Sequence, residues 1–359
     1  MRLSFFVFLA LAGFHSALFA AELPAFTVET GEIAGAKFTA AVPTQWNGRL
    51  LLLAHGLRGE DQPLTALLFT ERNPTKTLLE HGWMVAITSY RRNGVIIRRA
   101  ITDLESLRVH LAQKHGEPDR TYLMGDSMGG LIVTLIMEQF PDKYAGAIAV
   151  GAALHMEESV PTVSLTHFPQ RPILYLTNQS ELIGPYRYIQ SVPKNAVEPI
   201  LWVVARDGHV NVNAGERLLA LGALQQWVED GKVPPPERNA TLVPRPGPSQ
   251  ITFNPDGSAT GRVTFVHPLF GTFIANFQPA DLAQLGVKPG DKFQLVGFDG
   301  RLIKILYRET TDEDAPRGLL CSPEPEGFVA FGLQGGNAAA DAKLKLGDPV
   351  TLRPLKTAK

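Results

Sequence analysis

The segment Gly125-Asp126-Ser127-Met128-Gly129 constrains the fold of this chain more than any other. It follows a short apolar run, residues 121–124, and precedes residues 130–137, an apolar stretch that predicts a helix. A serine between two glycines at a strand-to-helix turn is typical of a nucleophile elbow, which exposes the serine hydroxyl. The positive N-terminal end of the helix favours a developing oxyanion beside it. We therefore predict that Ser127 is a nucleophile, with an ordinary helix cap as the alternative.

The length and the first residues of the chain set limits on its organisation. At 359 residues the chain exceeds the size at which single hydrophobic cores stop growing, so we expect two folded units. The formal net charge of -1 gives no reason to expect nucleic acid as a partner. Residues 1–21 combine an early arginine, a short apolar run and terminal alanines, so we expect a bacterial-type signal peptide. Export to a periplasm or beyond follows, without a membrane span after removal; an uncleaved anchor is the alternative.

Short apolar runs alternate with helical patterns through residues 24–232. One helical pattern covers residues 104–115, and Thr102 and Asp103 are expected to cap it. Continuous apolar strands joined by helical crossovers indicate an α/β fold, in which a mostly parallel sheet is covered on both faces. The runs that predict strands are residues 50–53, 84–87, 121–124, 146–150, 173–176 and 200–204.

Residues 25–235 resemble the catalytic domain of the α/β-hydrolases, which carries a nucleophile elbow after its fifth strand. In that family the nucleophile, the acid and the histidine follow one another along the chain, and this sequence can supply them in that order. The resemblance implies that His209, on the loop after the last predicted strand, is the catalytic base. It also implies an oxyanion hole made by the backbone N–H groups of Leu57 and Met128. His55, in the same His-Gly-Leu segment as Leu57, is expected to be structural.

The acid of the triad has to be a carboxylate beside Nδ1 of His209. The family places it after the strand that follows the cap region, and the resemblance implies Glu181, at a position that is commonly aspartate. Asp207 is one alternative, although its place two residues before the histidine makes the approach to Nδ1 awkward. Glu157 and Glu158 are the other alternative, and either would represent a relocated acid.

The composition changes at residues 233–250, where clustered prolines predict a stiff, extended linker. Beyond it the helical periodicity fades, and short strands between turns predict a small all-β barrel over residues 251–355. Because the two patterns look self-contained, we expect a fragment that ends near Pro236 to fold and remain active. The expected barrel strands are residues 251–253, 259–266, 272–277, 292–296, 302–307 and 350–352.

Residues 251–354 resemble the C-terminal barrel of the S-adenosylmethionine hydroxide adenosyltransferases and their fluorinase relatives. In that family the barrel forms part of a nucleoside pocket that an N-terminal domain completes, and this sequence has no counterpart of that domain. Thr272 also stands where the family prefers asparagine, although Asn276 is kept. The adenosyl reaction is therefore not implied, and we expect the barrel to be structural or to form the rim of a substrate site. The segments that carry the resemblance are residues 270–276, 326–328, 335–339 and 346–350.

These observations predict an exported serine hydrolase of carboxylic esters, with Ser127 as nucleophile, His209 as base and Glu181 orienting His209. A small-molecule ester is then the expected partner. An amidase, a peptidase or a thioesterase could use the same triad, and a binding protein that works through the barrel is the alternative from another class. We expect no cofactor and no metal, because histidines and carboxylates do not recur at ligand spacing. Cys321 is the only cysteine, so no intrachain disulfide forms.

Overall fold

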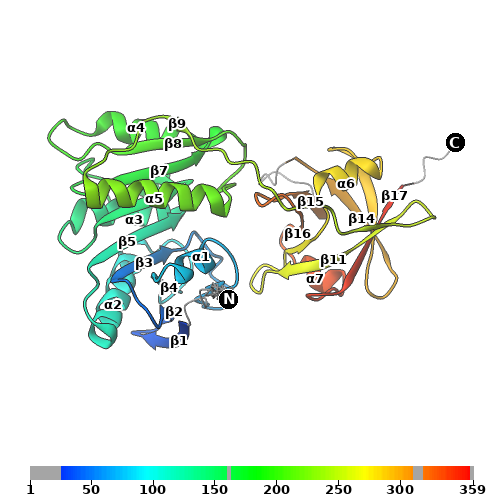
Figure 1. Ribbon diagram of the computed structural model, residues 1–359, viewed down its shortest axis with the longest axis horizontal. Helices are drawn as coiled ribbons and strands as arrows, with labels where there is room; N and C mark the ends of the chain where they lie inside the picture. Colours follow the sequence, from blue (N-terminus) through cyan, green and yellow to red (C-terminus); the bar gives the residue numbers. More distant parts are fainter. Residues whose placement is uncertain (1–25, 160–162, 310–317, 356–359) are drawn as a thin grey trace, which may run out of the picture.

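The computed structural model describes residues 26–159, 163–309 and 318–355, in which the chain forms two units (Figure 1). The N-terminal unit is a nine-stranded sheet with helices on both faces, and the C-terminal unit is a β-barrel. Both agree with the fold class expected from the sequence. The signal peptide predicted at residues 1–21 lies outside the described residues. In the part of the chain that is described, no helix has both the length and the hydropathy that crossing a membrane requires.

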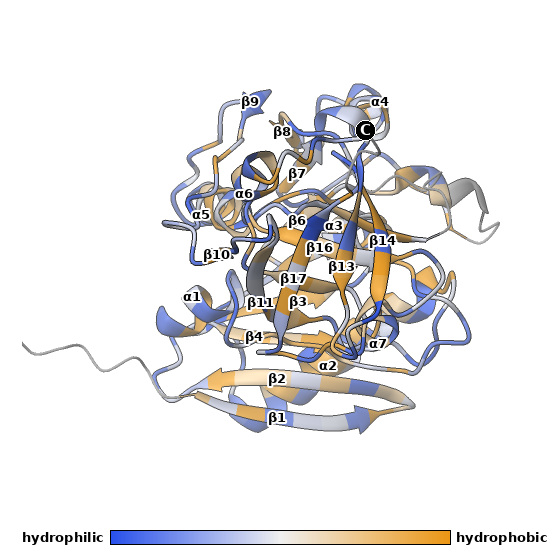
Figure 2. Cartoon of the chain, turned by 90° about the vertical axis from the view of Figure 1, so that its right-hand side faces the viewer, coloured by the Kyte–Doolittle hydropathy of each residue, from blue (hydrophilic) through white to orange (hydrophobic). Residues whose placement is uncertain are grey.

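The N-terminal sheet is antiparallel at one edge and parallel elsewhere. The β1–β2 hairpin pairs antiparallel with β4, and the other neighbours run parallel in the order β4-β3-β5-β6-β7-β8-β9. Central strands such as β4 are fully buried, as expected under two helical layers, whereas β1 is largely exposed and mixed in hydropathy (Figure 2). The strands are β1 Phe26–Ile33, β2 Ala36–Pro43, β3 Arg49–Ala54, β4 Met84–Thr88, β5 Arg120–Asp126, β6 Gly146–Val150, β7 Ile173–Asn178, β8 Ile200–Val204 and β9 Arg238–Asn239.

Helices cover both faces of this sheet. They are α1 Thr75–Glu80, α2 Ile97–His115, α3 Met128–Gln139, α4 Ile183–Ser191 and α5 Ala214–Asp230, with short 3₁₀ turns at η1 Leu154–Ser159 and η2 Gln179–Glu181. One face is packed by α2, α3 and α4, and the other by α1 and α5. Helix α3 is apolar all round and almost completely buried, because it lies between the sheet and its neighbouring helices. This burial fixes the position of its first turn, which follows Ser127.

Helix α2 begins earlier than the sequence predicted. Thr102 and Asp103, expected as its cap, lie inside the helix, which starts at Ile97. Ile97 and Ala100 are buried and extend the apolar face towards the N-terminus, so the helix has packing to gain before residue 102. The buried Asp103 carboxylate accepts a hydrogen bond from the backbone N–H of Arg91 at 2.9 Å and pairs with its guanidinium. Asp103 therefore fixes the preceding loop to the helix, and the prediction of a cap was wrong.

The C-terminal unit is a closed ring of seven strands in the order β11-β12-β16-β15-β14-β13-β17, with β17 paired back to β11. Neighbours are antiparallel except for β14 and β15. The short strand β10 pairs with β11 outside the ring. Phe273 and Phe331 stack in the interior with ring centroids 4.7 Å apart. The elements are β10 Thr252–Phe253, β11 Ala259–Val266, β12 Phe273–Ala275, β13 Lys292–Val296, β14 Leu302–Tyr307, β15 Leu319–Pro323, β16 Val329–Leu333, β17 Pro349–Pro354, α6 Pro279–Gln284 and α7 Ala338–Asp341.

Strands β15 and β16 were not predicted from the sequence. Both are short, and Pro323, Pro325 and Gly327 lie in or between them, where such residues ordinarily interrupt strands. They form because alternate side chains, among them Cys321 and Phe331, are buried in the barrel core. Both strands lie on the side of the barrel that faces the N-terminal unit (Figure 1).

The first half of the proline-rich segment 233–250 belongs to the N-terminal unit. The indole Nε1 of Trp202 donates a hydrogen bond to the carbonyl of Pro235 at 2.9 Å. Strand β9 then pairs with β8, and the N–H of Ala240 donates to the carbonyl of Val203 at 2.7 Å. The connection between the two units is therefore shorter than the composition indicated.

Glu216 joins the same segment to the start of α5. Its carboxylate is completely buried and accepts hydrogen bonds from the N–H groups of Asn213 and Leu242, both at 2.8 Å. It also pairs with the guanidinium of Arg206. One side chain thus holds the N-terminus of α5, the loop before it and the chain that leaves the sheet.

Two contacts among the described residues join the barrel to the N-terminal unit. Phe69 meets Phe265 of β11 edge to face with ring centroids 5.3 Å apart, and the guanidinium of Arg72 lies 4.1 Å from the same ring. At the other place the N–H of Ala214, at the start of α5, donates to Oε1 of Glu326 at 2.7 Å. Because Glu326 lies in the β15–β16 hairpin, this bond holds the hairpin beside the loop that precedes α5.

Candidate active site

Ser127 occupies the sharp turn between β5 and α3. Its backbone has φ 57° and ψ −118°, a conformation that a residue with a side chain rarely adopts and that holds the hydroxyl clear of the helix. The flanking glycines are required by space. A Cβ on Gly125 would lie 2.1 Å from the carbonyl oxygen of Gly129, and one on Gly129 would lie 2.0 Å from that of Ala54. The turn therefore has the geometry of a nucleophile elbow.

The loop after β3 passes directly over Ser127. A Cβ on Gly56 would lie 3.1 Å from Cβ of Ser127 and 3.7 Å from its Oγ. Leu57 follows Gly56 in this loop, with 51% of its surface exposed. Met128 is the first residue of α3, and an N–H at that position has no acceptor within its own helix. Both residues predicted for the oxyanion hole therefore adjoin Ser127, and the role of their N–H groups stays a prediction.

His209 and Glu181 meet at the carboxyl ends of β7 and β8. Nδ1 of His209 is hydrogen-bonded to Oε1 of Glu181, and 50% of the histidine side chain and 24% of the glutamate side chain are exposed. The second carboxylate oxygen, Oε2, is buried and has no hydrogen-bond partner among the described residues. A carboxylate on Nδ1 is the arrangement that fixes the tautomer of a catalytic histidine and leaves Nε2 for the proton transfer.

The other candidate acids are placed differently. Asp207 accepts a hydrogen bond from Nε2 of Gln179 at 3.0 Å. Its backbone carbonyl accepts a second bond, from Nδ2 of Asn211 at 2.7 Å, which closes the loop on itself. The side chains of Glu157 and Glu158 lie outside the described residues. Glu181 is thus the candidate that is seen to contact His209.

The loop that carries His209 is fixed to the loop that carries the acid. The buried amide of Asn178 accepts a hydrogen bond from the N–H of Asn211 at 2.8 Å and donates to its carbonyl at 2.9 Å. Ser180 Oγ accepts the N–H of Gly208 at 3.0 Å. These bonds flank His209 on both sides, so its position relative to the acid is set by the end of β7.

The sheet has the order β1-β2-β4-β3-β5-β6-β7-β8, and the elbow lies directly after β5, the fifth strand, as the sequence resemblance implied. Residues 95–206 match the model of the serine aminopeptidase S33 family, a stretch that includes Ser127 and Glu181 and ends before His209. The N-terminal part of this chain has an α/β-hydrolase fold.

Several solved structures are similar to this chain at low sequence identity. The esterase Pf2001 of Pyrococcus furiosus is 14% identical, over 57% of this chain and 91% of that one, with a TM-score of 0.42. Est1E of Butyrivibrio proteoclasticus is 16% identical, over 56% and 98% of the two chains, with a TM-score of 0.40. An uncharacterized conserved protein of Thermotoga maritima is 22% identical over 32% of this chain, with a TM-score of 0.26, and the match spans 40% of that protein. A comparison with curated proteins gives no match.

Gly151, at the end of β6, packs against both loops of the hydrolase site. Its φ is 50°, and a Cβ there would lie 3.1 Å from Oε2 of Glu181 and 3.2 Å from the backbone nitrogen of Val210. A side chain at this position would push the acid away from His209. Sequence reasoning missed Gly151 and Asn178. The signal that could have found them is a small or polar residue at the carboxyl end of a strand.

His55 has internal contacts in the hydrolase domain. Its ring stacks on Tyr90 with centroids 4.0 Å apart, and Nδ1 lies 2.7 Å from the carbonyl oxygen of Gly56. Burial, assisted by the positive charge of Arg58, lowers the pKa of His55 to about 4, so the ring is neutral at pH 7. These contacts hold His55 in place within the loop that follows β3.

Asp126, which precedes Ser127, ties the elbow to α5. The guanidinium of Arg217 donates to both of its carboxylate oxygens, at 2.7 and 3.1 Å. Paired bonds of this kind fix orientation as well as distance. Helix α5 therefore supports the nucleophile turn from one side and, through its N-terminus, the His209 loop from the other.

Two other kinds of reactive group are a metal site and the thiol of Cys321. Within the described ranges, no group of three or more His, Cys, Asp or Glu side chains is placed to hold a metal ion. Cys321 is buried in the barrel core, and burial raises the pKa of its thiol well above the ordinary range. Cys321 is therefore a poor nucleophile at neutral pH.

Proposed function

We propose that the protein is a serine hydrolase of carboxylic esters that works through an acyl-enzyme, with Ser127, His209 and Glu181 as its triad. The contact between Glu181 and Nδ1 of His209, on the sheet edge where Ser127 occupies the elbow, is the observation that carries the proposal. The match of residues 95–206 to a serine peptidase family supports a serine mechanism. It does not decide whether the leaving group is an alcohol, an amine or a thiol.

In the proposed reaction His209 takes the proton of Ser127 as Oγ attacks the ester carbonyl. The N–H groups of Leu57 and Met128 hold the oxyanion of the tetrahedral intermediate. The C–O bond of the ester then breaks, and His209 returns the proton to the departing alcohol. Water attacks the acyl-enzyme by the same path and releases the carboxylic acid. Glu181 stabilises the imidazolium during both steps.

Ester cleavage is distinguished from its rivals by the leaving group. The purified protein is assayed with an acetyl ester, an acetyl anilide and an acetyl thioester. Their leaving groups carry the same chromogenic aryl ring and differ in the atom bonded to the acyl carbon. We expect the ester to be hydrolysed at least about a hundredfold faster than the anilide, because an amide needs a protonated leaving group and a more stabilised transition state. Preference for the anilide or the thioester would assign the protein to the amidases, peptidases or thioesterases.

A binding protein that works through the barrel is the second class of function. It predicts no turnover of any substrate in this panel and no reaction with a fluorophosphonate probe, which modifies activated serines. Covalent labelling of the parental protein that is lost in Ser127→Ala would exclude it, because labelling requires an activated hydroxyl and no knowledge of the substrate.

We also propose that the protein is exported, on the pattern of residues 1–21 alone. Expression of the full gene product in a bacterial host, followed by fractionation and N-terminal sequencing, tests this. We expect a form that begins near residue 21 or 22 in the periplasm or the medium. A protein that stays in the cytoplasm with its first residues intact would contradict the proposal.

A further inference from the structure

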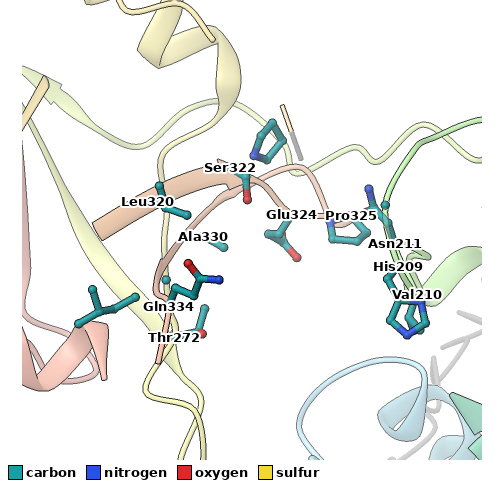
Figure 3. A pocket seen from close by; sticks show the side chains of 14 residues that line it. His209, Val210, Asn211, Thr272, Leu320, Ser322, Glu324, Pro325, Ala330 and Gln334 are labelled. Atoms are coloured by element: carbon teal, nitrogen blue, oxygen red, sulfur yellow. The ribbon is translucent and has the colours of Figure 1, made fainter. Parts of the chain in front are cut away.

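A cavity of about 420 Å³ lies between the hydrolase domain and the barrel, and its hydrolase wall is the loop that carries His209 (Figure 3). The opposite wall comes from β15, β16 and the residue before β12. The hydrogen bond between Ala214 and Glu326 holds the two walls together. A ligand beside His209 in this cavity therefore touches the barrel as well as the catalytic domain.

The barrel wall of this cavity presents several polar side chains. Ser322 is 5% exposed, and neither its hydroxyl nor that of Thr272 has a hydrogen-bond partner among the described residues. Glu324 accepts the N–H of Phe328 on Oε1 at 3.2 Å and a second backbone hydrogen bond from Glu326, and its carboxylate, which has lone pairs on both oxygens, also lines the cavity. Figure 3 shows Ser322 and Glu324 directed into the cavity from the barrel side. Hydroxyls that open into a cavity and have no protein partner are available to bond to a ligand or to water.

The barrel wall also carries Gln334 and several apolar residues. Leu320, Ala330 and Pro325 line the same cavity between the polar groups. Hydroxyls and a carboxylate over an aliphatic surface match a molecule that carries several hydroxyl groups on a C–H framework.

The place of the cavity identifies the part of the substrate that enters it. His209 returns its proton to the leaving alcohol, so the alcohol oxygen has to lie next to the imidazole when the ester bond breaks. The acyl group stays on Ser127 at that moment. The cavity beside His209 is therefore on the alcohol side of the ester.

We propose that this cavity binds the alcohol part of the substrate and that the alcohol is a polyol, such as glycerol or a sugar. The inference rests on the ester-hydrolase function proposed above. Ser322, Thr272 and Glu324 bind the free hydroxyls, and the aliphatic wall packs on the carbon chain. In the reaction the ester C–O bond breaks, Oγ of Ser127 gains the acyl group, and the polyol leaves with the proton from His209. The barrel is then the part of the protein that selects the substrate.

The test compares two acetate esters that differ in hydroxyls alone, 1-monoacetylglycerol and propyl acetate. The full-length protein hydrolyses each ester, and titration of the acetic acid produced gives the rate. We expect kcat/KM for the glycerol ester to be at least about tenfold higher, since one hydrogen bond to a buried polar group is worth about that factor.

Glu324→Met removes both oxygens and keeps the side-chain length, and Ser322→Ala removes the hydroxyl. In either variant we expect the preference to fall about tenfold, mainly through a higher KM for the glycerol ester. Glu309→Met, at an exposed barrel position outside the cavity, is the matched control and should keep the parental preference.

Each preference is a ratio measured on one preparation, so partial misfolding of a variant lowers both rates and leaves the ratio intact. Equal rates for the two esters in the parental protein would overturn the inference while the ester-hydrolase proposal stands. A preference that survives both Glu324→Met and Ser322→Ala would also overturn it, because the hydroxyls would then bind elsewhere. If neither ester nor 4-nitrophenyl acetate is hydrolysed, the proposed function itself fails and this inference fails with it.

Discussion

Replacing Glu181 by glutamine tests whether this carboxylate orients His209. The change keeps the size of the side chain but offers Nδ1 of His209 either an amide oxygen without charge or an NH₂ group. Oε2 of Glu181 has no hydrogen-bond partner among the described residues, so nothing there holds the amide in the productive orientation. The NH₂ group then either faces Nδ1, which selects the wrong tautomer, or lies buried without an acceptor.

The size of the effect follows from the exposure of the pair. Loss of a triad carboxylate costs up to about ten-thousand-fold in kcat where the site is closed. Half of the His209 side chain is exposed, so water stabilises part of the imidazolium charge when the carboxylate is gone. We therefore expect Glu181→Gln to lower kcat about a thousandfold, which corresponds to about 4 kcal/mol of transition-state stabilisation.

Asp207→Asn is the matched control. Asp207 bonds to Gln179 at an exposed position, and an asparagine oxygen can accept the same bond, so we expect a loss of about threefold or less. Both variants are assayed for kcat with 4-nitrophenyl acetate, and circular dichroism checks that each is folded. A larger loss in Asp207→Asn would move the acid to Asp207. A loss below about tenfold in both would refute the reasoning and direct attention to residues 157 and 158.

Three further results are expected. Ser127→Ala should lose both ester turnover and labelling by a fluorophosphonate probe with its circular dichroism unchanged; a variant that still takes up the probe would rule Ser127 out. Burial lowers the pKa values of His55 and His267 to about 4, so the unfolded chain binds more protons below pH 6.5. Stability in urea should fall as the pH drops from about 6.5 to 4, by up to about 3 kcal/mol for His55 and by less for the partly exposed His267, and a flat profile would contradict both pKa shifts. Glu216→Gln places an amide NH₂ against backbone donors and should cost about 3 kcal/mol of unfolding free energy, whereas the exposed Asp230→Asn should stay within about 0.5 kcal/mol.

Local sequence patterns were sufficient where local physics decides the structure. The elbow could be predicted because close packing between β5 and α3 leaves room for glycine alone at Gly125 and Gly129. The start of α2 could not, because Asp103 looks like a cap until its partner Arg91, in a preceding loop, is known. Strands β15 and β16 were missed because proline and glycine interrupt them and the barrel core stabilises them. Ser322 lies in β15 and was therefore missed as well. Its place in the cavity beside His209 depends on how the two units pack.

Strand β9 has a consequence for how the hydrolase domain can be isolated. A fragment that ends near Pro236 would lose this strand and leave the backbone of Trp202 and Val203 as an open sheet edge. Unpaired edges of apolar strands are templates for association with other chains, so such a fragment should aggregate even though its active site is complete. A fragment that ends after Val243 keeps the edge strand and the bond from Leu242 to Glu216. The boundary of the catalytic domain as an autonomous, soluble protein is thus set by edge protection and lies beyond the first prolines of the linker.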